Sequence, residues 1–347
     1  MDFNSDNISK FKGLIEQAEE IVLFVHHNPD GDALGSSLAL KTVLESMNKK
    51  ATVISPNELP GFLSFLPGFS SVVVYDSSSD DSKQLIDSAD LYICCDFNRP
   101  ERMNNLHKII DFGRCPSIVI DHHPFPLDFV TLIFSETKVS STSELVFHIL
   151  ESSGYLSQLP VSGADSLFVG IVTDTGGFSH NCSTPDIYLA VAKLMEIGVQ
   201  RDAIYDHIFR SNTIERLKLT GNCLGNNLVH LDEFGAAYFC ISDKDKDIYN
   251  IKPGDTEGLV NMPLSVKGIT LSAMFTENEG MVKVSLRSKY DFPANAICEK
   301  YFNGGGHTNA AGGRVNMSLT EAVALYIKSL EEYKSELIRY KAYAVSQ

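Results

Sequence analysis

Short runs of apolar residues alternate with helical patterns in the N-terminal part of the chain. Five of these runs predict β-strands, at residues 21–25, 52–54, 72–74, 91–95 and 118–120. Apolar residues at helical spacing predict helices at 33–47, 143–150 and 164–172, and Thr184-Pro185 predicts the start of another that ends near 197. Alternation of this kind is typical of a doubly wound parallel sheet, so we expect an α/β fold.

The C-terminal part has a different pattern of predicted elements, because its β-type runs follow one another more closely. Residues 235–241, 269–276 and 281–287 predict strands, and Glu277-Asn278-Glu279-Gly280 predicts a hairpin turn between the last two. We expect a helix at 292–302, a glycine-rich loop at 303–313 and one long closing helix at 319–343. This pattern indicates a second, smaller α/β domain.

The length of the chain also favours two domains, since 347 residues exceed the usual size of one hydrophobic core. The pattern of predicted elements changes near 210–213, between predicted helices at 201–209 and 214–228, and we expect the domain boundary in this region. We expect an N-terminal domain at 1–195, a helical linker at 196–228 and a C-terminal domain at 229–347, with a cleft between the two domains.

Histidines and aspartates gather where four of these elements end. The clusters are His26-His27-Asn28-Pro29-Asp30-Gly31-Asp32, Asp96, Asp121-His122-His123 and Asp174. The first three follow predicted strands, and residues just past the carboxyl ends of parallel strands meet at one edge of the sheet. Imidazole and carboxylate ligands suit Mn²⁺ or Mg²⁺. The sequence therefore predicts one site for two divalent cations and two-metal hydrolysis of a phosphate ester.

Each cluster also has a structural interpretation. Asp30 and Asp32 could form a solvated turn that caps a helix, and Asp96 could be a helix cap. Asp174 ends a helical pattern, where the helix dipole disfavours a negative charge unless something compensates it. The four clusters together favour metal binding over capping.

Composition limits the partners of the protein. The chain has 44 acidic and 29 basic residues, a net charge of −15, and no basic run. Proteins that hold long nucleic acids neutralise many phosphates, so a long nucleic acid is not an expected partner. No apolar run is long enough to cross a bilayer, and the polar N-terminus argues against a signal peptide. Seven scattered cysteines without a Cys-x-x-Cys pair fit a reducing cytoplasm, where we expect the protein.

The motifs resemble those of a known superfamily and occur in its order. They are His-x-x-Pro-Asp-x-Asp-Ala-x-Gly-Ser (26–36), Asp96, Asp-His-His (121–123), Thr-Asp-Thr-Gly-Gly-Phe (173–178), Val-Ser-Leu-Arg-Ser (284–288) and Gly-Gly-Gly-His-Thr-Asn-Ala-Ala-Gly-Gly (304–313). The first four are similar to the DHH phosphoesterase superfamily, which includes RecJ-type exonucleases, family II inorganic pyrophosphatases and nanoRNases. The last two resemble the DHH-associated substrate-binding domain.

The resemblance implies two cation sites that share one bridging aspartate. The ligands of the first would be His26, Asp30 and Asp96. The ligands of the second would be Asp32, Asp96, His122 and Asp174. Two Mn²⁺ ions are the favoured cofactors, with Mg²⁺ as the alternative.

The resemblance also implies roles beyond metal binding. Asp121 would orient a ligand histidine, and His123 would act in catalysis by binding phosphoryl oxygens or protonating the leaving group. Substrate binding is assigned to Arg287, Ser288, Gly305, Gly306 and His307. A guanidinium suits phosphate binding or base stacking, and glycine N–H groups approach anions closely. A surface ion pair for Arg287 and a flexible loop for the glycines are the alternative interpretations, and Phe125-Pro126 is interpreted as core or lid packing.

We therefore expect a manganese-dependent phosphodiesterase that cleaves very short oligoribonucleotides to mononucleotides, with pAp phosphatase activity as well. Its partners would be short RNA or a small nucleotide, without long nucleic acid or membrane, and a homodimer is left open. The rival substrates are cyclic di-AMP or pApA, and pyrophosphate or polyphosphate. A rival of another class is a nucleotide-binding regulator without activity.

Overall fold

The computed structural model describes residues 3–76, 80–252, 254–278 and 280–346. The chain divides into two compact units, Met1–Ser211 and Asn212–Gln347. Each unit is described by itself.

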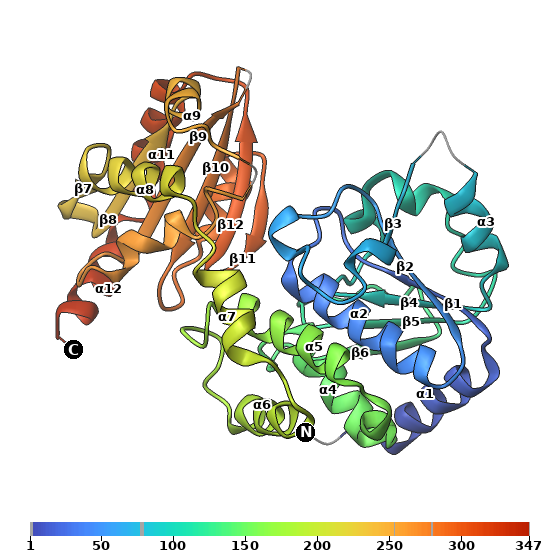
Figure 1. Ribbon diagram of the computed structural model, residues 1–347. Helices are drawn as coiled ribbons and strands as arrows, with labels where there is room; N and C mark the ends of the chain where they lie inside the picture. The colour runs from blue at the N-terminus through green and yellow to red at the C-terminus, as the bar shows by residue number, and fades with distance from the viewer. Residues whose placement is uncertain (1–2, 77–79, 253, 279, 347) are drawn as a thin grey trace. The chain divides into compact units, whose positions relative to one another are not determined.

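The first unit is built on a six-stranded parallel sheet (Figure 1). Its strands are β1 (Glu20–Phe24), β2 (Lys50–Ser55), β3 (Val73–Val74), β4 (Leu91–Cys95), β5 (Ser117–Asp121) and β6 (Leu132–Ser135). They lie in the order β3-β2-β1-β4-β5-β6, and every neighbouring pair is parallel. The predicted doubly wound sheet is confirmed. The chain adds β2 and β3 on one side of β1 and then places β4 on the other side of β1. In sheets of this kind, ligands bind at the carboxyl ends of the two strands between which the order reverses.

Helices cover both faces of this sheet. They are α1 (Ser5–Gln17), α2 (Gly31–Ser46), α3 (Asp81–Ser88), α4 (Thr142–Ser153), α5 (Val161–Asp174), α6 (Pro185–Ile197) and α7 (Arg201–Phe209), with 3₁₀ helices η1 (Gly61–Leu63), η2 (Phe69–Ser71), η3 (Pro100–Ile109) and η4 (Tyr155–Gln158). Alternate residues of β1 enter two cores. Ile21 and Leu23 pack with residues of α1, α2, α4 and α5, whereas Val22 and Phe24 pack with residues of α3 and η3.

Helices α2 and α5 approach each other unusually closely. A Cβ atom at Gly35 would lie 2.4 Å from the carbonyl oxygen of Ser166, so only glycine fits there. A Cβ atom at Gly31 would lie 2.3 Å from Oγ1 of Thr173. The helices therefore run antiparallel, and the last residue of α5, Asp174, reaches the N-terminal end of α2.

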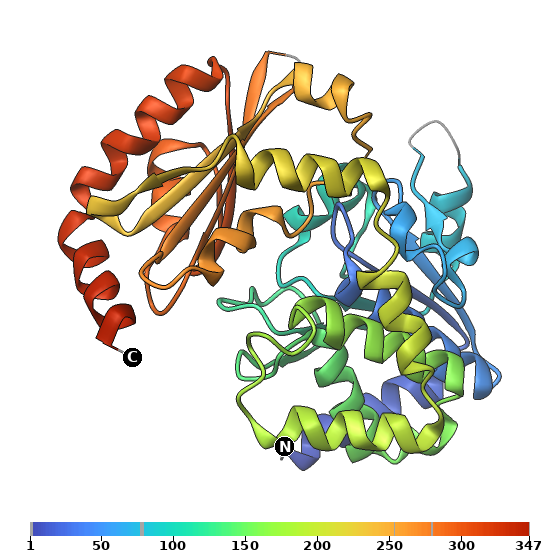
Figure 2. The same cartoon turned by 60° about the vertical axis from the view of Figure 1, so that its left-hand side comes forward.

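The second unit contains a mixed six-stranded sheet in the order β11-β12-β10-β9-β8-β7. The strands are β7 (Val229–Leu231), β8 (Ala236–Ile241), β9 (Leu271–Asn278), β10 (Met281–Ser288), β11 (Gly305–His307) and β12 (Ala310–Val315). Its helices are α8 (Ile214–Gly225), α9 (Asp243–Ile248), α10 (Ala294–Tyr301), α11 (Leu319–Glu332), α12 (Lys334–Ser346), η5 (Asp232–Phe234) and η6 (Leu259–Ser265). Residues of α10, α11 and α12 pack on one face and residues of α8 and η6 on the other (Figure 2).

Two predictions for the second unit were wrong. Residues 303–313 are not a loop, because β11 and β12 pair within them as an antiparallel hairpin. Gly306 is needed there for its φ of 141° and because a Cβ atom would lie 2.4 Å from the carbonyl oxygen of Ala310. The closing helix is also broken, since Tyr333 (φ −100°, ψ 10°) leaves the helical conformation between α11 and α12. In the predicted turn between β9 and β10, Glu279 lies outside the described residues.

The segment predicted as a linker, 196–228, is shared between the two units. Helix α7 packs on α5 in the first unit, and α8 packs on β8 in the second. The cleft expected between the domains stays a prediction. No helix in the described part of the chain is long and apolar enough to span a bilayer.

Candidate active site

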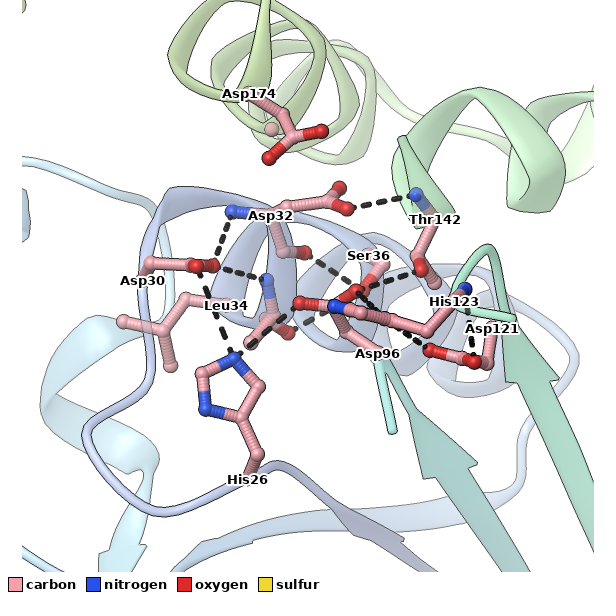
Figure 3. Close-up of polar contacts among 12 residues, drawn as sticks. His26, Asp30, Asp32, Leu34, Ser36, Asp96, Asp121, His123, Thr142 and Asp174 are labelled. Atoms are coloured by element: carbon pink, nitrogen blue, oxygen red, sulfur yellow. Dashed lines mark hydrogen bonds and ion pairs between the residues drawn. The ribbon is translucent and has the colours of Figure 1, made fainter. Parts of the chain in front are cut away.

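The turn after β1 brings His26 and Asp30 together (Figure 3). The Nδ1 atom of His26 donates to the carbonyl oxygen of His27 over 3.0 Å, which leaves Nε2 as the atom able to bind a cation. That Nε2 lies 3.8 Å from Oδ2 of Asp30. The other oxygen, Oδ1, caps α2 by accepting the N–H groups of Asp32 and Ala33 at 3.0 Å each. Asp30 therefore caps the helix with one oxygen and presents the other to His26. The capping interpretation is confirmed, and metal binding by Asp30 stays a prediction.

Asp96 lies at the centre of the cluster, directly after β4. Its Oδ2 is 3.3 Å from Nε2 of His26, and its Oδ1 is 3.7 Å from Nε2 of His122. The residue is buried and has a φ of 65°, a conformation that costs a non-glycine residue energy and is found mostly at functional sites. Asp96 contacts the histidines of both predicted cation sites, as a bridging ligand must.

A second group forms around His122. Its Nε2 lies 3.9 Å from Oδ2 of Asp32 and 3.8 Å from Oδ2 of Asp174, the last residue of α5 (Figure 3 shows both aspartates). The side chains of His26, Asp30 and Asp96 form one set with ligand atoms within 4.8 Å of one another, and those of Asp32, His122 and Asp174 form another. The structure thus brings all six predicted metal ligands together, from four segments of the first unit.

The N-terminal end of α4 holds two of these carboxylates, which sequence reasoning missed. The backbone N–H groups of Thr142 and Ser143 donate to the two oxygens of Asp32, over 2.6 and 2.8 Å. The hydroxyl of Thr142 donates to Oδ1 of Asp96 over 2.8 Å. The available signal was Ser141-x-x-Glu144, a typical helix start, and Ser141 does accept the N–H of Glu144.

The crowding of carboxylates makes this cluster suitable for cations. Burial and then the charges of Asp96 and Asp174 raise the pKa of Asp32 well above its ordinary value. Burial, with Asp30 and Asp96, does the same to the pKa of Asp174. Among the described residues, the ion pairs of these four aspartates are all with histidine. Crowded like charges, of which Asp32 and Asp96 are buried, fit a site that divalent cations neutralise.

The histidines respond to the same environment. Burial opposes protonation of His26, but Asp96 and Asp30 outweigh it and raise its pKa to about 9. Burial also opposes ionisation of Asp96, yet the histidines around it lower its pKa. Burial lowers the pKa of His122 against the opposing effect of Asp96. Arg102, which sequence reasoning also missed, adds a positive charge that opposes protonation of His26.

Asp121 orients His123. Its Oδ1 accepts Nδ1–H of His123 over 2.7 Å, and its Oδ2 accepts the backbone N–H of the same residue over 2.9 Å. The sequence predicted that Asp121 orients a histidine that binds metal. His123 is not one of the six predicted ligands, but it does form a possible metal-binding group with Asp96 and His122. Burial opposes protonation of His123, but the bond to Asp121 and the charge of Asp96 raise its pKa.

In the second unit, the strand register aligns two predicted substrate-binding residues. Arg287 of β10 and His307 of β11 are both paired with Ala310 of β12, so they lie in one row with only a methyl side chain between them. Arg287 is half-buried, and its burial lowers the pKa of the guanidinium against the opposing charge of Glu257. Cross-strand neighbours of this kind lie within reach of one extended ligand.

The other predicted substrate-binding residues have structural contacts. The hydroxyl of Ser288 donates to the carbonyl oxygen of Phe292 over 2.7 Å and accepts Nδ2–H of Asn309 over 2.9 Å. Gly305 and Gly306 pair with Gly312 and Ala311 in the β11–β12 hairpin. These three residues build the frame beside Arg287 and His307.

Comparison with known proteins identifies the family. Residues 20–171 match the DHH family, N-terminal domain, and residues 240–336 match the DHHA1 domain. A solved structure of an exopolyphosphatase-related protein from Bacteroides fragilis is similar with a TM-score of 0.94 and 37% identity, over 96% of this chain and 98% of that one. The chain belongs to the DHH family and is a hydrolase of phosphate esters with a DHHA1 domain.

Two relatives have names that specify substrates. Both are called bifunctional oligoribonuclease and PAP phosphatase NrnA. The Bacillus subtilis protein is 28% identical over 86% of this chain and 90% of its own length. The Thermus thermophilus protein is 29% identical over 92% of this chain and 90% of its own length. The likeness therefore covers both domains.

Proposed function

We propose that this protein is a Mn²⁺-dependent phosphodiesterase that hydrolyses very short oligoribonucleotides to mononucleotides and also dephosphorylates pAp. The observation that carries the proposal is the gathering of six metal-ligand side chains around Asp96 in a chain whose named relatives align with it in both domains. A relative that shared only the metal domain would support the chemistry and leave the substrate open.

The predicted metal ligands would form two sets that share Asp96. His26 and Asp30 would hold one cation with Asp96, and Asp32, His122 and Asp174 would hold the second. Divalent cations bound there supply the positive charge that activates water and stabilises the phosphoryl transition state. The side chains Asp32 and Asp96 are fixed in advance by α4, so little reorganisation is needed when cations bind.

His123 is the residue we propose for proton transfer. Its bond from Nδ1 to Asp121 fixes the ring and leaves Nε2 as the atom that exchanges a proton with the substrate. A protonated His123 would donate to the leaving oxygen of the cleaved ester. Asp121 acts through His123 and is a positioning residue.

The DHHA1 domain would bind the substrate through Arg287 and His307. A guanidinium and an imidazole in one row suit the phosphate and base of a nucleotide, because both are planar donors. The cytoplasmic location stays a proposal, which rests on the scattered spacing of the seven cysteines in the sequence.

The direct test is a substrate panel in excess Mn²⁺: pApA, a short oligoribonucleotide, pAp, cyclic di-AMP and pyrophosphate. We expect the highest kcat/KM on the linear oligoribonucleotides and measurable release of phosphate from pAp. Asp32→Ala and Asp96→Ala should abolish both activities, since each removes a ligand. Preference for cyclic di-AMP or for pyrophosphate would replace the proposed substrate with that rival.

A further inference from the structure

An aromatic side chain stands exposed beside the candidate active site. Phe125 follows His123 by two residues, in the sequence Pro124-Phe125-Pro126, and its exposed fraction is 81%. Of the two interpretations of Phe125, core or lid packing, this exposure excludes packing in the core. Leu127, in the same loop, is 44% exposed. Phe125 and Leu127 thus place two large apolar side chains in water within one short loop next to the candidate active site.

The loop that carries Phe125 is fastened at both ends to one buried residue. The amide Nδ2–H of Asn98 donates to the carbonyl oxygen of Pro124 over 2.7 Å, and the carbonyl oxygen of Asn98 accepts the N–H of Leu127 over 3.1 Å. Asn98 is two residues past Asp96 and only 6% exposed. The loop is therefore fixed to the carboxyl end of β4, the edge of the sheet where the metal ligands gather.

The backbone at Phe125 is strained. Its φ is 63°, which is uncommon for a non-glycine residue and costs of order 1 kcal/mol or more. A residue that precedes proline is also restricted to extended conformations, and Pro126 follows Phe125. Strain of this kind persists where the surrounding structure imposes it, and it gathers at ligand-binding sites. Here it accompanies full exposure of the ring.

We propose that Phe125 is a platform on which one nucleobase of the substrate stacks while the neighbouring phosphate lies at the metal ligands. This inference rests on the proposed nucleotide substrate and adds a subsite to it. From His123 to Phe125 the extended chain spans at most about 7 Å, the scale on which a nucleotide separates its phosphate from its base. Stacking accepts every base, so the platform would select nucleotides over inorganic phosphates without selecting a base.

The test compares Phe125→Ala with Phe125→Trp, which keeps an aromatic face, and with Leu127→Ala as the matched control in the same loop. Each is assayed on a dinucleotide and on the same dinucleotide made abasic at either position. Loss of a base–aromatic stack should raise KM by about 5- to 150-fold for Phe125→Ala on the normal substrate. Its KM on one of the abasic substrates should equal that of the wild type, and Phe125→Trp and Leu127→Ala should stay close to the wild type.

A second measurement keeps the proposal testable without turnover. A 2-aminopurine dinucleotide with a non-hydrolysable linkage is titrated into the Mn²⁺-loaded protein, and stacking should quench its fluorescence with the wild type and not with Phe125→Ala. Equal quenching by the two proteins would overturn the proposal. An equal loss of activity of Phe125→Ala on all three substrates would also overturn it, because it would mean that Phe125 positions His123. An unchanged KM together with a loss of self-association would overturn it as well, because it would mean that Phe125 forms a contact between copies of the chain. If the wild type hydrolysed none of the nucleotides yet quenching depended on Phe125, the proposed function would fail and the subsite would stand.

Discussion

The hydroxyl of Thr142 donates to Oδ1 of Asp96 over 2.8 Å, and both residues are buried. The backbone N–H of the same threonine donates to Asp32, so one residue at the start of α4 holds two carboxylates from different elements. Partners of this kind fix metal ligands in orientation and raise their affinity for the cation. The N-terminal end of α4 is therefore part of the candidate metal centre, although none of its residues is a predicted metal ligand.

Replacing Thr142 tests this positioning role. Thr142→Val keeps the shape of the side chain and the backbone bond to Asp32 but removes the hydroxyl. Loss of such a partner should weaken Mn²⁺ binding by about 10- to 100-fold, as measured by isothermal titration calorimetry. Thr142→Ser should restore most of the affinity, because it restores the donor.

Ser153→Ala is the matched control for that series. Ser153 is buried on the same helix, and its hydroxyl donates to the carbonyl oxygen of Leu150, away from the metal ligands. We expect this variant to bind Mn²⁺ like the wild type. Equal Mn²⁺ affinity for Thr142→Val and the wild type would show that α4 does not position the ligands.

Asp174→Asn should have opposite effects with and without cations. In metal-free protein the substitution removes a charge that burial, Asp30 and Asp96 make unfavourable. The melting temperature in EDTA should rise by roughly 2–4 °C for each kcal/mol gained. With Mn²⁺ the order should reverse, because the variant lacks a ligand.

The gain from Asp174→Asn should depend on pH. The folded-state pKa of Asp174 is raised, so between the unfolded value near 3.9 and the raised value the native state binds more protons than the unfolded state. Wild-type stability therefore falls as pH rises through this window, whereas asparagine does not titrate. The variant's advantage in EDTA should be small near pH 4 and larger near pH 7. An advantage that stays constant with pH would contradict this account.

Arg287 and His307 should affect the substrate and not the metal. Arg287→Ala or His307→Ala should raise KM by about 10- to 150-fold, the loss expected for one charge-assisted hydrogen bond. Mn²⁺ affinity should be unchanged. Lys283→Ala is the control, because Lys283 lies four residues earlier on β10 and side chains four apart on a strand share a face. A weaker Mn²⁺ affinity in His307→Ala would place that residue in the metal site instead.

Local sequence patterns predicted the elements that carry the metal ligands. The apolar runs before His26 and Asp96 became the adjacent strands β1 and β4, and the rule for parallel sheets placed the residues after them at one edge. The edge strand β6 was not among the predicted strands. The helix before Asp174 was predicted, and its glycine-lined contact with α2 completed the site.

Features that depend on contacts distant in sequence could not be predicted in the same way. Thr142 lies 46 residues from Asp96 along the chain, and the sequence around either residue does not predict their hydrogen bond. The glycines at 304–306 predicted a loop whose N–H groups approach an anion, whereas the structure uses Gly306 for a close approach of two strands. Phe125 was interpreted as a packing residue, whereas its side chain is exposed. The exposure of a side chain depends on the whole fold and cannot be predicted from the adjacent residues in the sequence.

Substrate length tests the central claim most directly. The candidate metal centre belongs to a chain of net charge −15 whose sequence has no basic run to hold a long phosphate backbone. The measurement is kcat/KM of the wild type in Mn²⁺ on end-labelled oligoribonucleotides from two to about 24 nucleotides, at low and moderate salt. We predict the highest values at about two to four nucleotides, a steep fall beyond that length and a shallow dependence on salt. Equal values on the dinucleotide and the longest strand, or a steep salt dependence, would contradict it.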